Sequence, residues 1–268
     1  MPFAQIDDHQ LHYREYGSGD PVIGIMGFAI DQRFWAAQVP AVSATNRFIT
    51  FDNRGIGRST GSPPDSIEQM AEDTLRLMDR LDIADAVLFG VSMGGTVAQK
   101  IALERPERVK ALILAVTFAR PIEYIRREQS LAKAIFEKAD FDTFMEGSLI
   151  HLFSPAFFEI GEETIDRMVR AFYAEGGPEP AGADALTAQL DAMEKFDVLA
   201  ELGRIEVPTL VIGATHDMMV PYFASEEIAR AIPNARLETL EGGHGVMVEQ
   251  MQPFNDLVRE FLDKIKAG

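Results

Sequence analysis

The feature that most constrains this fold is a series of short, continuously apolar segments separated by helical patterns. In the first 120 residues these segments are 22–26, 47–51, 86–91 and 109–116. Apolar runs of this length are typical of strands covered on both faces, as in parallel sheets. Residues 65–81 carry apolar side chains at helical spacing, with Asp65 as the expected N-cap and Glu68 as its partner. We therefore expect an α/β fold with a doubly wound, mostly parallel sheet.

The strand pattern stops at Pro121 and returns near residue 203. Between these positions lie helical segments, a loop rich in Gly and Pro at 176–182, and eight phenylalanines, but no convincing core strand. Strand-like runs at 207–212 and 236–240, a helix after Pro221 and a last helix starting near Val248 then resume the earlier pattern. We expect residues 1–120 and 203–268 to form the core, with residues 121–202 inserted as a helical cap, or lid.

Composition excludes several classes of protein. The net charge is −17, from 42 acidic and 25 basic residues, and this balance repels the phosphate backbone of a nucleic acid. The absence of cysteine excludes disulfides, thiolate metal sites and a cysteine nucleophile, and it suits the cytoplasm. The N-terminal residues carry no secretory signal, and residues 22–30 are too short an apolar stretch to span a membrane. We expect a cytoplasmic protein with no membrane or nucleic-acid partner; its oligomeric state stays open, a homo-oligomer included.

A G-x-S-x-G motif at residues 90–94 lies between an expected strand and an expected helix. This context would hold Ser92 in a sharp, strained turn that lifts its hydroxyl above the sheet. The small residues Gly90 and Gly94 avoid collisions with neighbouring backbone, and the N–H of Met93 would point at a developing oxyanion. A glycine-rich turn that merely closes a βα unit is the alternative, but the strand and helix favour a nucleophile.

A serine nucleophile needs a base, and the sequence offers one histidine in a suitable place. His244 lies between glycines, after the last strand and before the last helix, where a core role explains it poorly. The other histidines are weaker candidates: His9 and His12 as surface or hairpin residues, His151 as a packed cap residue, and His216 as too close in sequence to Asp217.

The base needs a carboxylate to orient it. Asp217 follows the strand-like run at 207–212 and precedes the helix after Pro221, so it is placed at the carboxyl edge of the sheet. A turn or capping aspartate is the simpler interpretation of this residue alone. The chain order Ser92, Asp217, His244 favours the catalytic one, because it is the order of the fold that carries this serine motif.

Together, these motifs resemble the α/β-hydrolase fold, and in particular its lidded esterases, enol-lactonases and cofactor-free haloperoxidases. The resemblance covers nearly the whole chain outside the insertion and rests on residues 27–28, 52–59, 90–95 and 106–109, with Pro208, Gly213, Asp217 and His244. It implies that the backbone N–H of Phe28 is the second oxyanion donor beside that of Met93. One departure is Met26, where most relatives have histidine, so that a polar side chain beneath this loop is missing.

No cofactor and no catalytic metal are expected. The segment Gly55-Ile56-Gly57 follows a strand, but its third glycine is out of register and no helix begins there, so a structural loop is favoured over dinucleotide binding. The chain contains neither a P-loop lysine motif nor an H-E-x-x-H motif.

The expected activity is hydrolysis of a carboxylic ester or lactone through an acyl-serine. Perhydrolysis as in haloperoxidases, C–C bond hydrolysis and a receptor without turnover are the alternatives on the same fold. An apolar, neutral substrate is favoured, because the insertion is rich in apolar residues and the whole molecule is acidic. A dicarboxylate-derived enol-lactone would instead need a cation, and Arg120, Arg126 and Arg127 could supply one. We interpret these arginines as solvated charges of the cap.

Overall fold

A computed structural model describes residues 2–138, 141–165 and 182–267, and its centre is an 8-stranded sheet. The order of its strands is β1-β2-β4-β3-β5-β6-β7-β8. Their bounds are β1 (Phe3–Ile6), β2 (His9–Tyr16), β3 (Pro21–Ile25), β4 (Arg47–Phe51), β5 (Ala86–Val91), β6 (Val109–Ala115), β7 (Thr209–Ala214) and β8 (Ala235–Leu240). The pairs β1–β2 and β2–β4 are antiparallel, and the other neighbours are parallel. The predicted mostly parallel sheet is confirmed.

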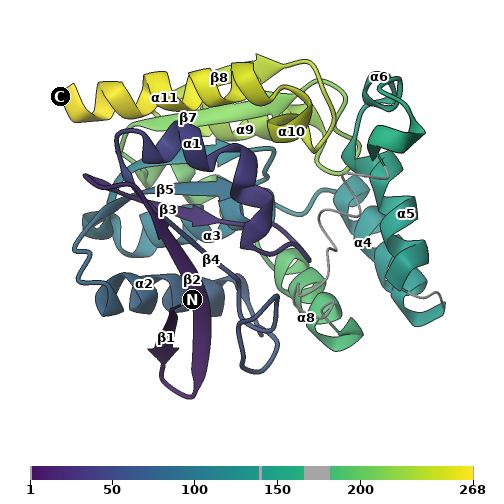
Figure 1. The fold of residues 1–268 in the computed structure, drawn as a ribbon, viewed down its shortest axis with the longest axis horizontal. Coiled ribbons are helices and arrows are strands. Elements are labelled where there is room, and N and C mark those ends of the chain that lie inside the picture. The colour runs from purple at the N-terminus through teal and green to yellow at the C-terminus, as the bar shows by residue number, and fades with distance from the viewer. Residues whose placement is uncertain (1, 139–140, 166–181, 268) are drawn as a thin grey trace.

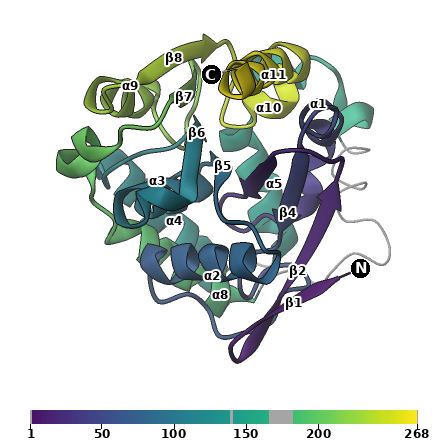
Figure 2. The ribbon, with the colours of Figure 1, turned by 90° about the vertical axis from the view of Figure 1, so that its left-hand side faces the viewer.

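Helices cover both faces of this sheet (Figures 1 and 2). One face carries α2 (Ile67–Arg80), α3 (Met93–Glu104) and α9 (Tyr222–Ala231), and the other carries α1 (Val39–Ser43) and α11 (Met251–Ala267). Short helices complete the connections: η1 (Gln32–Ala37), η2 (Pro106–Arg108), η3 (Leu199–Arg204) and α10 (Val246–Glu249). The doubly wound arrangement expected from the alternation of strands and helices is therefore present.

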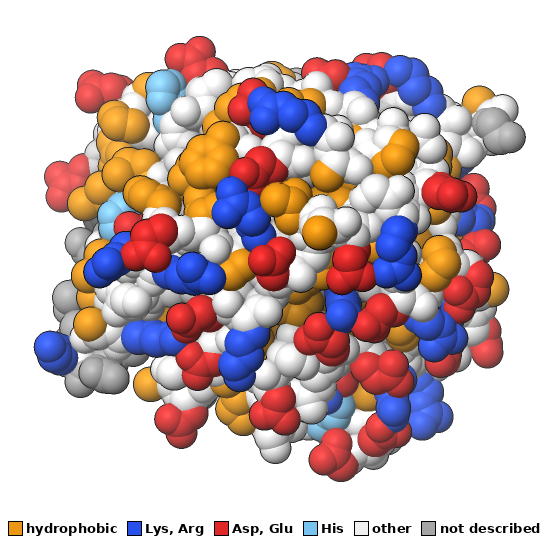
Figure 3. Space-filling view, turned by 180° about the vertical axis from the view of Figure 1, so that it is seen from behind, with side chains coloured by type: hydrophobic (Ala, Val, Ile, Leu, Met, Phe, Trp, Pro, Cys, Tyr) orange, Lys and Arg blue, Asp and Glu red, His pale blue; other side chains and the backbone are white. Residues whose placement is uncertain are grey.

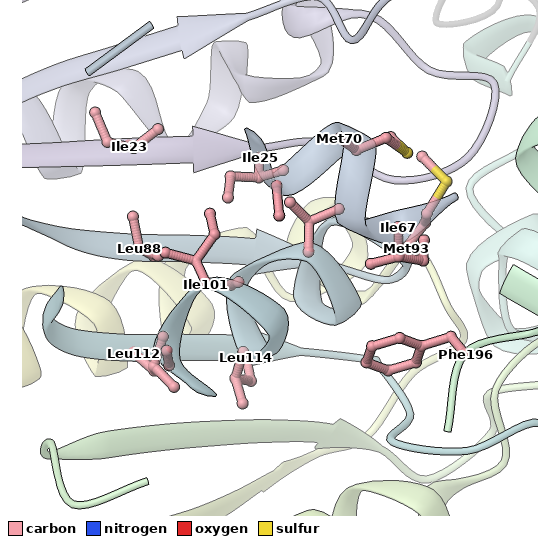
Figure 4. Packing of buried hydrophobic residues seen from close by; sticks show 14 of the residues in the cluster. Ile23, Ile25, Ile67, Met70, Leu88, Met93, Ile101, Leu112, Leu114 and Phe196 are labelled. Carbon is pink, nitrogen blue, oxygen red and sulfur yellow. The ribbon is translucent and has the colours of Figure 1, made fainter. Parts of the chain in front are cut away.

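Each face of the sheet buries its own hydrophobic cluster. In Figure 4, Ile23, Leu88 and Leu112 from neighbouring parallel strands lie near Ile101 of α3. Trp35 is fully buried in the cluster on the opposite face. Because both faces are covered, strands β3 to β7 are apolar almost throughout, which is why their positions could be predicted from the sequence.

In the described part of the segment between β6 and β7, helices are the regular secondary structure and no strand occurs. It contains α4 (Glu123–Lys138), α5 (Phe141–Leu152), α6 (Pro155–Phe158) and α8 (Ala183–Glu194). These helices lie to one side of the sheet, beside the carboxyl ends of the parallel strands (Figure 1). Part of the loop expected at 176–182, and Phe172 with it, lies outside the described residues.

Two local features differ from the expectations. The strand β1 was not expected; it is short, half exposed and carries no apolar run, and it is held by antiparallel pairing with β2. Helix α2 is capped by Ser66, whose hydroxyl accepts from the N–H of Gln69, and not by Asp65. The last helical region starts at Val246 as α10, close to the expected start near Val248, and it breaks before α11.

The interpretation of His9 and His12 as surface residues is wrong, although both lie in the N-terminal hairpin. Their exposed fractions are 3% and 2%. The Nδ1 of His12 lies 2.8 Å from a carboxylate oxygen of Asp52, and Nε2 of His9 lies 3.4 Å from one of Asp73. Buried polar groups of this kind need partners, and the two aspartates provide them.

Charged side chains of both signs are interspersed over the surface seen in Figure 3. Many charged side chains of the described residues form ion pairs with their neighbours. No helix in the described part of the chain is long and apolar enough to cross a membrane.

Candidate active site

Ser92 occupies the sharp turn between β5 and α3, with a strained backbone. Its φ is 53° and its ψ is −123°, a combination that residues with a side chain rarely adopt. The turn is held on both sides, because the N–H of Ser92 donates to the carbonyl of Ala115 at 2.9 Å. The hydroxyl of Thr117 donates to the carbonyl of Ser92 at 2.6 Å. The strain expected from the sequence motif is therefore observed.

The two glycines of the motif are required by close backbone contacts. A Cβ atom at Gly90 would overlap the carbonyl of Gly94, and one at Gly94 would overlap the carbonyl of Ile25. Met93 follows Ser92 as the first residue of α3, so its N–H belongs to the unpaired amides of the helix N-terminus. The local fold thus presents Ser92 at a helix end that favours negative charge.

His244 and Asp217 come together at the carboxyl edge of the sheet. The Nδ1 atom of His244 lies 2.8 Å from Oδ2 of Asp217, and their side chains are only 7% and 1% exposed. The second oxygen, Oδ1, accepts from the backbone N–H groups of Met219 at 2.8 Å and Val220 at 2.7 Å. These contacts fix the orientation of the carboxylate and leave one oxygen for the imidazole.

The loop that carries His244 is fastened to the inserted helices, which are α4, α5, α6 and α8 between β6 and β7. Oε1 of Glu249 accepts from the N–H of Gly243 at 2.8 Å and from the N–H of Ser154 at 2.9 Å. Its other oxygen accepts from the Ser154 hydroxyl at 2.6 Å. A Cβ atom at Gly245 would lie 2.5 Å from the ring of Phe153, so this close approach explains a flanking glycine. No sequence motif marked Glu249 or Ser154.

The loop after β3, which carries the expected oxyanion donor Phe28, is held by two amide side chains. Nδ2 of Asn53 donates to the carbonyl of Met26 at 3.1 Å. Oε1 of Gln189, from α8, accepts from the N–H of Ala29 at 3.0 Å, and Ala29 has a left-handed φ of 62°. Asn53 and Gln189 thus hold this loop by hydrogen bonds to its backbone, a support that the side chain of Met26 cannot give.

Two cavities meet at Ser92. The larger, of about 140 Å³, lies under the inserted helices and is lined by residues of α4, α5 and α8 together with Ser92 and Phe28. The smaller, of about 80 Å³, is lined by Ser92, Phe28, His244 and the loop after β3. Four residues line both cavities: Phe28, Ser92, Ser148 and Met219. Ser92, His244 and Phe28 thus share one site, and Asp217 is in contact with its histidine.

The walls of both cavities are mostly apolar. No Lys or Arg occurs among the described residues that line them. Their polar members include Glu128 and His151, whose Oε2 and Nδ1 atoms lie 3.8 Å apart. His151 is therefore a cavity residue, whereas the sequence suggested only packing within the cap. Arg120 is instead paired with Glu227, through two hydrogen bonds of 2.7 and 3.1 Å.

Tyr124 links α4 to the loop of the candidate acid. Its hydroxyl donates to the carbonyl of Met218 at 2.6 Å. Partial burial, aided by the charges of Glu128 and Asp217, raises the pKa of this phenol above its usual value. The phenol therefore stays protonated near neutral pH and keeps the donor that this hydrogen bond needs. Within the described part of the chain, no group of His, Asp and Glu side chains is arranged to hold a metal ion.

Comparisons with known proteins place these observations in a family. A model described as the alpha/beta hydrolase fold matches residues 20–250, and the chain belongs to that family. The enol-lactonase from Burkholderia xenovorans LB400 superposes with a TM-score of 0.88 at 28% identity, covering 98% of this chain and 100% of that one.

Two curated relatives span almost the full chain. The first, from Azorhizobium caulinodans, is provisionally named carbamate hydrolase RutD; it is 29% identical over 271 residues, covering 99% of both chains. The second, from Mycobacterium tuberculosis, is provisionally named non-heme bromoperoxidase BpoC; it is 32% identical over 271 residues, covering 96% of this chain and 99% of its own. The family and these relatives support a hydrolase that acts on a small molecule.

Proposed function

We propose that this chain is a serine hydrolase that cleaves carboxylic esters or lactones through an acyl-serine intermediate. The observation that carries the proposal is the strained turn at Ser92, which opens into two apolar cavities. One of these cavities also contains His244, which is itself hydrogen-bonded to Asp217. A hydroxyl, a base and an orienting carboxylate in this relation are the groups that acyl transfer requires.

In the proposed reaction, Ser92 Oγ attacks the carbonyl carbon while Nε2 of His244 takes its proton. Asp217 holds the Nδ1–H tautomer and stabilises the imidazolium. The N–H groups of Met93 and Phe28 stabilise the oxyanion, each by roughly 3–4 kcal/mol in comparable sites. The bond to the leaving oxygen then breaks as His244 returns the proton to it. Water attacks the acyl-serine in the same way, which releases the acid and restores the Ser92 hydroxyl.

The preferred substrates of this proposal are neutral. Burying an apolar group in these cavities contributes about 25 cal/mol per Å². A substrate carboxylate would meet Glu128 and no cation among the described lining residues. Arg127 pairs with Glu123, and Arg126 is exposed, so neither replaces the missing clamp. The contacts therefore favour neutral esters and lactones over a dicarboxylate-derived enol-lactone.

We further propose that residues 121–202 act as a cap over the core formed by 1–120 and 203–268. The support is that residues of α4, α5 and α8 line the same cavity as Ser92. A cap of this kind excludes water and shapes the space that the substrate fills. Perhydrolysis, carbamate hydrolysis and C–C cleavage would use the same three residues, so the substrate panel must include them.

The test compares the wild type with Ser92→Ala on short-chain p-nitrophenyl esters. We expect the variant to stay folded and to lose at least about 10³-fold in kcat, as for removal of a nucleophile elsewhere. Ser130→Ala is the matched control, because this exposed serine bonds only to its own helix in the structure. An early burst of p-nitrophenol and a mass increase of one acyl group should accompany turnover. A Ser92→Ala variant with more than about a tenth of wild-type kcat would exclude Ser92 as the nucleophile.

A further inference from the structure

The larger cavity contains one polar side chain for which the proposed reaction has no use. Gln129 lies on α4, is only 6% exposed and lines the cavity together with Ser92. Both polar atoms of its carboxamide, Oε1 and Nε2, are buried and have no hydrogen-bond partner among the described residues. A buried amide in this state lowers stability, because it has lost its hydration without a replacement.

The position of Gln129 on its helix makes this choice of residue informative. The residues of α4 that line the cavity recur at helical spacing, and Ile125 and Ala132 flank Gln129 along this face. An apolar side chain at position 129 would complete the face without an unmatched polar group. A polar residue in place of an apolar one on such a face is expected where that residue binds a ligand.

We propose that Gln129 forms a recognition subsite for an uncharged amide on the substrate of Ser92. The amide is a primary carboxamide or a ring amide, since these present an N–H and a carbonyl on the same side. Oε1 of Gln129 accepts from that N–H while its Nε2 donates to that carbonyl, so that both unmatched atoms gain partners in two parallel hydrogen bonds.

Charged groups fit this subsite less well. A carboxylate would accept from Nε2 but leave Oε1 without a donor, and it would also face the carboxylate of Glu128 in the same cavity. An ammonium group would donate to Oε1 but leave Nε2 without an acceptor. A methyl ketone accepts from Nε2 alone. Among these groups, the amide alone offers both a donor to Oε1 and an acceptor to Nε2. Sites built in this way discriminate strongly against analogues that lack one of the two.

The inference rests on the proposed acyl transfer at Ser92, and it is tested with a matched series of esters. Each ester carries a terminal carboxamide, methyl ketone or carboxylate at the end of a two- to four-carbon linker, in the acyl chain or in the alcohol. For one linker and placement, we expect wild-type kcat/KM to favour the carboxamide over the ketone by about tenfold or more. Gln129→Leu should lose this preference for the carboxamide over the ketone, and Ser130→Ala should keep it as the wild type does.

A stability measurement tests the premise separately. Because Gln129→Leu removes an unmatched buried amide and keeps the side chain's size, its Tm without ligand should equal or exceed that of the wild type. A lower Tm would mean that the carboxamide is already paired in the free protein and would overturn the proposal. Equal preference for the carboxamide in wild type and Gln129→Leu, or no preference at any linker length, would overturn it as well.

A binding experiment separates failure of the subsite from failure of the proposed function. If the wild type turns over none of the esters, acyl transfer at Ser92 is refuted. Calorimetric binding of the carboxamide ester to Ser92→Ala and to Ser92→Ala/Gln129→Leu still decides the subsite. Binding about tenfold tighter to the first variant supports it, whereas equal affinity for both variants refutes it.

Discussion

Replacing Asp217 by asparagine tests the proposed mechanism through a feature that the structure makes unusually clear. Oδ1 of Asp217 accepts from the N–H groups of Met219 and Val220, and Oδ2 faces Nδ1 of His244. In Asp217→Asn the amide oxygen takes the place of Oδ1 beside these two N–H groups, because only an acceptor can satisfy two N–H donors. The amide nitrogen then faces the imidazole, which must place its proton on Nε2 and cannot accept one from Ser92.

The expected fall in kcat depends on how rarely the asparagine side chain adopts the flipped orientation, with its amide oxygen facing His244. Turning the amide over would restore the productive tautomer, but it would lose two buried hydrogen bonds at about 1–3 kcal/mol each. At about 1.4 kcal/mol per factor of ten, the productive form is at most about one molecule in 30. We therefore expect kcat to fall by between about 30-fold and the roughly 10⁴-fold known for the corresponding change in serine proteases.

The assay is steady-state hydrolysis of a neutral butyrate ester, together with the Tm of each variant. Asp217→Asn should keep its Tm close to that of the wild type, because the Oδ1 contacts survive. Asp217→Ala should lose activity and also Tm, because both N–H donors lose their acceptor. Asp197→Asn changes an exposed aspartate before η3 and is the control. A kcat for Asp217→Asn within tenfold of the wild type would refute the reasoning and move the acid elsewhere.

Two further predictions concern the support of the site and the acid stability of the fold. Glu249→Ala removes the acceptor shared by Gly243 and Ser154, so we expect the free energy of unfolding to fall by about 2 kcal/mol and kcat to fall as well. Glu249→Gln should retain much of the stability and of the activity. Denaturant unfolding and the ester assay measure the two effects. Hydrogen bonds from Lys264 and a neighbouring arginine lower the pKa of Glu260 to about 2 from 4.5. A carboxylate whose pKa is lower in the folded state stabilises the fold at pH above its unfolded pKa, and this contribution is lost as the pH falls through its folded pKa. Between pH 4.5 and 2, the Tm of Glu260→Gln should therefore depend less steeply on pH than the Tm of the wild type.

The strands that could be predicted best are those covered on both faces. Strands β4 and β5 begin and end where the apolar runs predicted them. A strand covered on both faces needs apolar residues at nearly every position, so the run itself shows its length. Strand β1 has no such run, since its side chains are alternately exposed and only Ala4 and Ile6 of its four residues are buried. His9 and His12 were misjudged for a related reason: their burial depends on aspartates 40 or more residues away.

The candidate site likewise contains some residues that could be predicted from the sequence and others that could not. Ser92 stands in a motif whose backbone strain fixes its neighbours, and its partners follow in a chain order typical of the fold, so the sequence could name all three. Gln129 could not be found in this way, because a glutamine on an amphipathic helix is ordinary until the structure shows its amide buried in the cavity of Ser92. Glu249 is likewise one acidic residue of a helix until Ser154, 95 residues away, is seen to contact it.

Hydrogen bonds connect the inserted helices to three loops of the candidate site. Gln189 holds the amide of Ala29 beside the expected oxyanion donor, Tyr124 holds the loop after Asp217, and the Ser154 segment holds the loop of His244 through Glu249. The bonds made by Gln189, Tyr124 and Ser154 each join residues that are more than 90 positions apart in the chain. Displacing the inserted helices as one body would therefore weaken the support of all three loops at once. The insertion thus helps to set the geometry of the groups that the proposed reaction uses, in addition to shaping the space above Ser92.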